Sequence, residues 1–399
     1  MPEIKIDLNK KMRSCKKCLL PETYETLEIA EDGNSCNMCS TYEFKKTEID
    51  WESRKKMLDD IILKYRDKYD YDCIIPFSGG KDSTYTLYYL MKEYKIKPLV
   101  VRFNHGFMRP KHEENVNNVL RKLGADFINF TPNWQIVKKL MLESFNRKTD
   151  FCWHCHTGIY SYPLQIALKF NVPLILWGEP LAEMSAYYTY EDDIVEWEDE
   201  EKFNMLRNLG ITADDMWGMI HSEEEPIDRR DLSPYTYPPL DALTEMDYYS
   251  VCLGSFIPWD YKKQTRLIQD ELGWKGFDLE GVPNSINQEF AKIECWMQAT
   301  RDYVKYLKRG YGRVTQLTNF EIRQGRMSTE EAQKWIDQYE GKKPESLQVF
   351  LEYVGLTEEE FNNTVKKFVV PPYQPDFENI ESAKPVFDMD KWYREDNRK

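Results

Sequence analysis

The chain has 399 residues, of which 41% are hydrophobic and 14% aromatic, and its formal net charge is -14. This length can bury two or more cores, so we expect a catalytic domain with a further module. The acidic charge excludes a broad nucleic-acid surface, because such a surface needs an excess of Lys and Arg. We also expect a soluble, cytoplasmic protein without a membrane partner, since neither a membrane span nor the apolar core of a signal peptide is present.

The first predicted element is a metal module in residues 1–48. Four cysteines there have the spacing C-x2-C-x17-C-x2-C: Cys15, Cys18, Cys36 and Cys39. The spacing is typical of a structural zinc site, because each C-x2-C turn directs two thiolates at one tetrahedral ion. Gly33 and Asn34 supply the bend before the second pair. We therefore expect a zinc ribbon whose bound Zn2+ supplies much of the folding energy.

A glycine-containing turn follows the next predicted strand. Residues 71–77 form an apolar run, and residues 82–94 have the pattern of a helix with Leu87, Leu90 and Met91 on one stripe. Backbone amides at such a strand-to-helix junction bind anions at the positive end of the helix dipole. The sequence therefore predicts phosphate binding by one group of residues: Ser78, Gly79, Gly80, Lys81, Asp82 and Ser83.

This turn differs from the G-x4-G-K-[ST] loop, because its glycines are adjacent and an Asp follows the Lys. The pattern S-G-G-x-D-S resembles the pyrophosphate loop of the PP-loop ATP pyrophosphatases, which cleave ATP between the α- and β-phosphates. The resemblance implies ATP and Mg2+ as cofactors. It also implies catalytic roles for Ser78, Lys81 and Asp82, since the leaving pyrophosphate has to be held in line and its charge neutralised.

Residues 49–187 are predicted to be a doubly wound parallel α/β domain. Further strands are expected in residues 96–106, 125–132 and 172–180, with helices in residues 113–124 and 157–171. Because ligands bind at the carboxyl ends of such strands, we expect nucleotide contacts from Phe103, Asn104 and Gly178, and Glu179 to reach a metal or the nucleotide. An N-cap or surface role for Glu179 stays open, as does a plain loop role for His105.

The rest of the chain is predicted to form three further segments. Residues 188–236 contain two acidic runs around a short helical pattern and are expected to be a solvated insertion or lid. Residues 237–370 are expected to be mainly helical, with Ser328 and Thr357 at helix N-termini. Residues 371–399 are expected to be a surface tail.

Two residue clusters have more than one interpretation. Cys152 and Cys155 form another C-x2-C, which Cys252 or Cys295 would complete as a metal or iron-sulfur site; a reactive thiol pair and two structural cysteines are the alternatives. A compact basic cluster suits a sugar diphosphate, with a solvated helix face as its alternative. Its members are Lys308, Arg309, Arg313, Arg323 and Arg326.

The chain resembles a known family over nearly its whole length. The resemblance rests on RSCKKC, PFSGGKDS, WGEP, FIPWD, ELGW and YLKRGYGRVTQLTNFEIRQGRMS. These stretches look like the N-acetyl sugar amidotransferase family of surface-polysaccharide and nonulosonic acid biosynthesis. The family implies conversion of an acetamido group of a nucleotide-activated sugar to an acetamidino group in O-antigen or other surface glycan biosynthesis. It also implies that ammonia comes from a separate class I glutaminase and a cyclase-like subunit.

The chemistry is consistent with such a partner. An amide carbonyl is a poor electrophile, so its oxygen first has to attack the α-phosphate, which gives an adenylated imidate that ammonia can convert by displacing AMP. The chain contains no Gly-x-Cys-x-Gly glutaminase elbow and opens with Met1 rather than a Cys nucleophile. We therefore expect ammonia to come from another protein.

The alternative function is tRNA thiolation, in which the same loop adenylates a base and the Cys152/Cys155 pair handles sulfur. The net charge of -14 disfavours it, because tRNA binding needs a basic field. A third interpretation, a zinc-ribbon binding module with a degenerate ATP site, is disfavoured by the intact loop.

Overall fold

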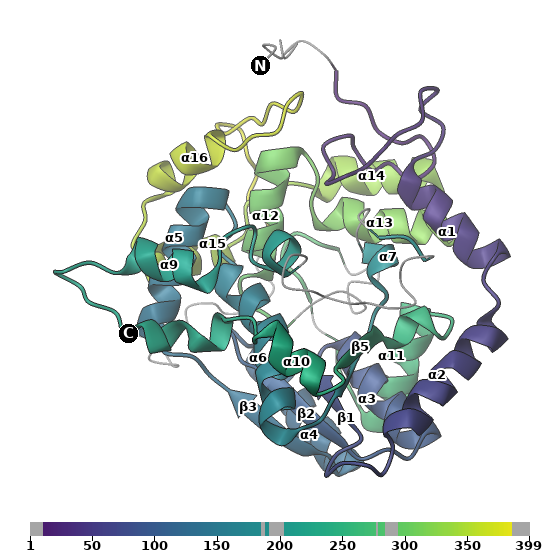
Figure 1. Ribbon diagram of the computed structural model, residues 1–399. Coiled ribbons are helices and arrows are strands. Elements are labelled where there is room, and N and C mark those ends of the chain that lie inside the picture. The colour runs from purple at the N-terminus through teal and green to yellow at the C-terminus, as the bar shows by residue number, and fades with distance from the viewer. Residues whose placement is uncertain (1–10, 185–187, 191–202, 277, 284–293, 385–399) are drawn as a thin grey trace. The chain divides into compact units, whose positions relative to one another are not determined.

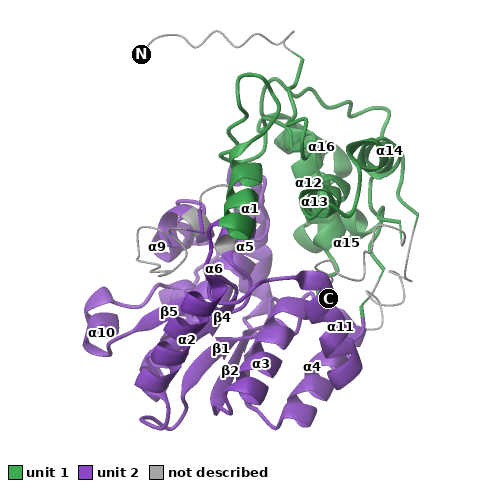
Figure 2. Cartoon of the chain, turned by 90° about the vertical axis from the view of Figure 1, so that its right-hand side faces the viewer, with its two compact units in different colours: residues 1–47, 185–187, 276–399 green, residues 48–184, 188–275 purple. Residues whose placement is uncertain are grey.

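The computed structural model describes residues 11–184, 188–190, 203–276, 278–283 and 294–384. The chain forms two compact units, which Figure 2 distinguishes by colour. The sheet unit comprises residues 48–184 and 188–275, and the terminal unit comprises residues 1–47, 185–187 and 276–399. The terminal unit therefore combines the N-terminal cysteines with the C-terminal helices. No helix in the described ranges is both long and apolar enough to cross a membrane.

The sheet unit is built on a parallel sheet with the strand order β3-β2-β1-β4-β5. Figure 1 labels β1, β2, β3 and β5, and Figure 2 labels β4. The strands are β1 (Cys73–Pro76), β2 (Pro98–Phe103), β3 (Asp126–Phe130), β4 (Leu174–Trp177) and β5 (Tyr249–Cys252). All four neighbouring pairs are parallel. Strands β1 and β2 are buried along their whole length, as expected of a parallel sheet that helices cover on both sides. The predicted parallel α/β sheet is confirmed.

The helices of the sheet unit are α2 (Trp51–Tyr65), α3 (Lys81–Glu93), α4 (Pro110–Leu123), α5 (Trp134–Lys148), α6 (Trp153–Phe170), α7 (Leu181–Met184), η2 (Phe203–Arg207), α9 (Ala213–Ile220), η3 (Arg229–Tyr235), α10 (Leu240–Glu245), η4 (Leu253–Ser255) and α11 (Tyr261–Leu272). Helix α3 packs against β1 and β4, and α6 packs against β1 and β2. The predicted stripe of α3 is buried at Leu87 and Leu90, while Met91 is only partly buried.

Strand β5 lies in the segment that was predicted to be mainly helical, and the sequence analysis predicted no strand at residues 249–252. Ser250, Val251 and Cys252 are buried where β5 pairs with β4. A run of four residues is too short for its periodicity to distinguish a strand from a helix. Pairing with β4 decides the conformation, and the sequence does not reveal that pairing.

Part of the predicted acidic insertion contributes to the core of the sheet unit. Met216, Leu232 and Tyr235 are buried in a cluster with Phe103 and Trp153. The predicted short helix is α9, which begins with a capping box. The described part of this segment is therefore partly packed, while residues 223–226 and 228–231 of its second acidic run are exposed, as predicted for a solvated insertion. The first acidic run lies mostly outside the described residues, and a lid role stays a prediction.

The terminal unit is helical after residue 294. Its helices are α1 (Asn37–Thr47), α12 (Gln298–Arg309), α13 (Arg313–Arg323), α14 (Thr329–Tyr339), α15 (Ser346–Val354) and α16 (Glu358–Lys366). Helix α12 packs against α15 and α16, and α13 packs against α14. The predicted caps are confirmed, because the Ser328 side chain accepts from the Glu331 amide and Thr357 forms a capping box with Glu360.

Candidate functional site

The SGGKDS loop, residues 78–83, joins the end of β1 to the first turn of α3. Two hydrogen bonds close it on itself: the Gly79 N–H donates to the Ser83 hydroxyl (3.1 Å) and the Gly80 N–H donates to the Ser78 hydroxyl (3.1 Å). The two hydroxyl oxygens lie 3.2 Å apart. The strand, turn and helix predicted around this loop are confirmed.

Donors from outside the loop bind its carbonyl groups. His112 Nε2 lies 2.7 Å from the Ser78 carbonyl oxygen, and the Trp274 indole donates to the Gly79 carbonyl at 3.0 Å. The first N–H groups of α3 have no acceptor within the helix, and together with the helix dipole they can bind an anion. Sequence reasoning missed these two donors, because they lie 34 and 195 residues from their acceptors.

Packing against α4 and the backbone conformation both require glycine at position 79. A Cβ at Gly79 would lie 2.3 Å from Val116 Cγ2 and 2.9 Å from His112 Nε2, and the residue has a φ of +81°. The missing side chain therefore makes room for α4, and the left-handed backbone adds a second requirement for glycine.

The loop carries a buried lysine and carboxyl pair. Lys81 Nζ and the Asp82 carboxyl form an ion pair, with only 12% and 15% of their side chains exposed. Burial, followed by the neighbouring Glu179, raises the pKa of Asp82 to about 8, although Lys81 opposes the shift. Carboxylate oxygens are the ligands that Mg2+ prefers, so Asp82 and Glu179 together fit a cation that would relieve their repulsion.

Glu179 reaches this pair because the end of β4 closely approaches α3. A Cβ at Gly178 would lie 2.9 Å from Thr86 Oγ1 and 3.3 Å from the Asp82 carbonyl oxygen, so only glycine permits this approach. The Gly254 N–H, which follows β5, donates to the Gly178 carbonyl at 2.9 Å. The charge of Glu179 raises the pKa of Asp82. This favours the interpretation of Glu179 as a residue of the candidate site over its interpretation as a helix N-cap. Sequence reasoning missed Gly254, for which no local signal exists.

The turn after β2 is mainly structural. The Phe103 ring is buried against Phe130 and Tyr235, so only the backbone of Phe103 is placed to contact a nucleotide. The Asn104 side chain accepts from the Gly106 N–H at 2.9 Å, and His105 Nδ1 accepts from the Phe107 N–H at 3.2 Å. These side-chain hydrogen bonds fix the turn itself. Nucleotide contacts of Phe103 and Asn104 stay a prediction.

The four N-terminal cysteines come together in the terminal unit. Their sulfur atoms all lie within 4.8 Å of one another, with 4.0 Å between Cys15 and Cys39 and 3.7 Å between Cys18 and Cys36. A tetrahedral ion with Zn–S bonds of about 2.3 Å would hold its sulfurs about 3.8 Å apart. All four side chains are buried. Gly33 makes the predicted bend with a φ of +74°. The donor set and its geometry therefore fit zinc.

Two residues of the predicted basic cluster bind the cysteine module, residues 11–47. Arg309 pairs with Glu25 (3.2 Å) and donates to the Thr23 carbonyl (2.5 Å). Arg323 is buried and donates to the Met38 carbonyl at 3.5 Å. The module and helices α12 and α13 are therefore joined by hydrogen bonds that use these guanidinium groups.

The other members of the cluster also have internal contacts. Arg313 binds Asp302 through two bonds of 2.8 and 3.0 Å, and Arg326 binds Glu321 through two bonds of 3.1 and 2.9 Å. The Lys308 backbone carbonyl accepts from the Val370 N–H at 2.8 Å, a contact that does not involve its ammonium group. For Arg313 and Arg326, an ion pair inside the fold is therefore a third interpretation beside the sugar-diphosphate site and the solvated helix face.

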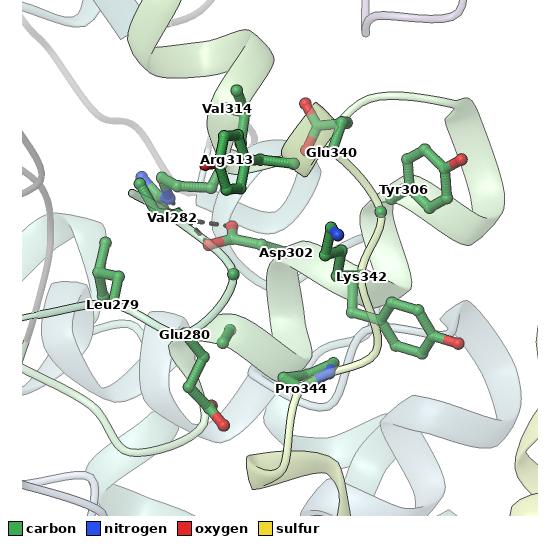
Figure 3. A pocket seen from close by; sticks show the side chains of 15 residues that line it. Leu279, Glu280, Val282, Asp302, Tyr306, Arg313, Val314, Glu340, Lys342 and Pro344 are labelled. Carbon is green, nitrogen blue, oxygen red and sulfur yellow. Dashed lines mark hydrogen bonds and ion pairs between the residues drawn. The ribbon is translucent and has the colours of Figure 1, made fainter. Parts of the chain in front are cut away.

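Arg313 and Asp302 also line a small pocket of the terminal unit (Figure 3). Glu340 lines the same pocket, its carboxyl accepts from the Thr315 N–H at 2.7 Å, and burial raises its pKa. Tyr306 lines the pocket as well. The pocket therefore combines paired charges with an aromatic ring.

The second cysteine pair stands at the start of α6. Cys152 is the N-cap residue and Cys155 lies in the first turn, and both are partly exposed. Cys295 belongs to the terminal unit. Within the described ranges, the N-terminal cysteines are the only group that brings three or more His, Cys, Asp or Glu ligand atoms together. A second metal or iron-sulfur site therefore stays a prediction.

Comparison with known proteins gives two similarities. Residues 284–386 match a family model described as the C-terminal domain of LPS biosynthesis protein WbpG-like proteins, and this stretch includes helices α12 to α16. A further 214-residue match, 51% of this chain and 76% of the relative, is 25% identical to the uncharacterized protein MJ1599 of Methanocaldococcus jannaschii.

Loss of a cysteine ligand should affect more than the cysteine module. We expect Cys15→Ser to release about one zinc ion per chain, because the tetrahedral site loses a thiolate. Amide hydrogen exchange should rise in residues 11–47 and also in α12 and α13, since Arg309 and Arg323 donate to carbonyl groups of the module. Ser40→Ala, in the same module, is the control. Elemental analysis measures the metal, and an unchanged zinc content would contradict the site.

Gly178→Ala should separate β4 from α3. The new methyl group would lie 2.9 Å from Thr86 Oγ1 and 3.3 Å from the Asp82 carbonyl oxygen, so the Thr86 side chain or the backbone has to shift. We expect a loss of about 1–3 kcal/mol in the free energy of unfolding, as for other overpacked sites. Gly218→Ala, in α9 with no atom within 4 Å of the new Cβ, is the matched control and should be neutral or stabilising. Equal denaturation midpoints for both variants would refute the close approach.

The raised pKa of Asp82 predicts a dependence of stability on pH. Between about pH 4 and about pH 8 the unfolded chain releases the Asp82 proton while the folded chain keeps it. The wild type therefore loses stability as pH rises, by at most about 1.4 kcal/mol per pH unit, and Asp82→Asn lacks this loss. Denaturant titrations without nucleotide or metal should show the variant gaining stability relative to wild type over this range. A constant difference would be inconsistent with the raised pKa.

Proposed function

We propose that this protein is an ATP-dependent N-acetyl sugar amidotransferase of the PP-loop type, acting in surface-glycan biosynthesis. One observation carries the proposal: the SGGKDS loop, Lys81 and the Asp82/Glu179 pair meet where β1 and β4 lie side by side. This is the point where the strand order reverses, at which open α/β sheets bind their ligands. The match of residues 284–386 to an LPS biosynthesis domain supports the glycan part.

The residues of the site have separate tasks in this proposal. The first turn of α3 and Lys81 bind the β- and γ-phosphates of ATP, and they stabilise the charge of departing pyrophosphate. Asp82 and Glu179 hold Mg2+, which would supply a further positive charge at the phosphates. Because Lys81 is paired with Asp82 and little exposed, it is held in place before substrate arrives.

The reaction balances without a protein nucleophile. The acetamido oxygen attacks the α-phosphate, the bond to the β-phosphate breaks, and pyrophosphate leaves. Ammonia then adds to the imidate carbon, and AMP leaves with the former carbonyl oxygen. Loss of a proton gives the acetamidino group. The protein's contribution is therefore to orient the two substrates and to exclude water from the adenylated imidate.

The nucleotide sugar and the ammonia source are also part of the proposal. Arg313 belongs to the predicted basic cluster and lines the pocket of the terminal unit, so we propose it for contact with the sugar substrate. Ammonia comes from a class I glutaminase acting with a cyclase-like subunit. An enclosed route matters because ammonia that escapes to solvent at neutral pH is protonated and loses its nucleophilic lone pair.

tRNA thiolation stays the second candidate because Cys152 and Cys155 are partly exposed at the start of α6. It shares the adenylation step and differs in the atom that replaces oxygen. Cys152→Ser separates the two functions: it should leave amidine formation intact and abolish thiolation.

The central test is product formation from ATP, ammonium and UDP- or CMP-linked N-acetyl sugars, followed by mass spectrometry. We expect a product in which NH replaces an oxygen, together with AMP and pyrophosphate. Lys81→Ala should abolish AMP formation, because the charge on the leaving pyrophosphate is no longer neutralised. Lys92→Ala, on an exposed position of the same helix, is the control. AMP release by Lys81→Ala at the wild-type rate would rule out this role for the loop.

A second experiment tests the ammonia source. The isolated chain should use free ammonium but not glutamine, and it should incorporate amide-labelled nitrogen from glutamine only when a glutaminase is added. Label in the sugar is read by mass spectrometry. Efficient incorporation by the isolated chain would show that it generates ammonia itself.

A further inference from the structure

Two side chains distant in sequence hold the SGGKDS loop from its carbonyl side. His112, in the first turn of α4, is completely buried, and Trp274, just after α11, is 2% exposed. His112 Nε2 lies 2.7 Å from the Ser78 carbonyl oxygen, which can only accept, so this nitrogen carries the proton and donates. The Trp274 indole donates to the Gly79 carbonyl at 3.0 Å.

These donors fix the orientation of two peptide planes. In a trans peptide the C=O and the following N–H point in opposite directions. His112 binds the carbonyl of the peptide whose N–H belongs to Gly79, and Trp274 binds that of the peptide whose N–H belongs to Gly80. Both N–H groups therefore face away from the donors, toward the loop's own serine hydroxyls. A flip of either peptide would break a hydrogen bond at each end.

Both donors belong to helices that pack against one another: His112 lies in α4, and Trp274 follows the end of α11. Helix α11 packs against α3 and α4, and Gly273 ends it in a left-handed conformation immediately before Trp274. The Asn115 side chain of α4 then binds the backbone of Lys275 in both directions, at 2.8 and 3.0 Å. Trp274 is therefore held to the same helix that carries His112. At the other end of α11, the centroid of the Tyr261 ring lies 5.9 Å from Lys81 Nζ.

We propose that His112 and Trp274 are positioning residues that keep the loop in its pyrophosphate-binding conformation, a proposal that rests on the proposed function. Neither residue touches the phosphates in this proposal. They act by holding the Ser78 and Gly79 carbonyls away from an arriving anion, which a carbonyl oxygen would repel. ATP and pyrophosphate then bind a loop that is already ordered, so little conformational entropy is lost on binding.

The test measures binding of inorganic pyrophosphate and of ATP with Mg2+ to the full chain by calorimetry. Trp274→Phe keeps an aromatic ring but removes the N–H, and we expect roughly tenfold weaker binding of both ligands, as for loss of one buried hydrogen bond. Trp217→Phe is the matched control, because it removes an indole bond to the Ile227 carbonyl (2.9 Å) outside the loop. The control should bind like wild type.

A pair of variants at His112 separates positioning from packing. His112→Gln keeps an N–H donor near the Nε2 position, whereas His112→Leu fills similar space without one. We expect His112→Gln to bind pyrophosphate several times more tightly than His112→Leu. Circular dichroism and denaturation midpoints show whether each variant is folded. If Trp274→Phe does not fold, the comparison of His112→Gln with His112→Leu tests the inference by itself.

The outcomes distinguish this inference from the proposed function. If the wild type binds neither ATP nor pyrophosphate, the proposed function fails and the inference fails with it. If the wild type binds both and folded Trp274→Phe binds equally well, the inference is overturned while the proposed function stands. Equal affinities for His112→Gln and His112→Leu would also overturn it.

Discussion

The candidate site depends on the parallel pairing of β1 with β4, because that pairing places the ends of two strands from distant parts of the chain beside one helix terminus. The SGGKDS loop leaves β1, and Glu179 follows β4. Gly178 has no side chain, so the end of β4 can approach the first turn of α3 closely. Burial first and the neighbouring Glu179 second raise the pKa of Asp82 at this place.

Glycine has a common role at several of these positions. Gly79, Gly178 and Gly254 each lie where a Cβ would collide with another element: α4, α3 and Pro180 respectively. These residues allow the elements around the site to pack closely, which keeps the loop and the carboxyl pair in fixed positions. In the terminal unit, hydrogen bonds rather than glycines hold the parts together: Arg309 and Arg323 donate to carbonyl groups of the cysteine module.

Local sequence was sufficient for the features whose cause is local. The cysteine spacing predicted a group of four sulfurs because two short turns determine their geometry, and Ser328 and Thr357 predicted helix starts because a cap acts within three residues. The strand, turn and helix around the SGGKDS loop were predictable for the same reason. The parallel sheet followed from the alternation of strands and helices, which permits few topologies.

Features that need contact between distant residues were decided only by the tertiary structure. The sequence by itself determined the loop, the cysteine group and the sheet class. It did not reveal β5, which is a strand because β4 offers its edge, nor the donors His112 and Trp274. It also suggested a ligand site for Arg309 and Arg323, but in the structure their guanidinium groups donate hydrogen bonds to backbone carbonyls of the cysteine module. The physical reason is that a side chain's partner depends on which elements pack together, and residue spacing along the chain does not encode that packing.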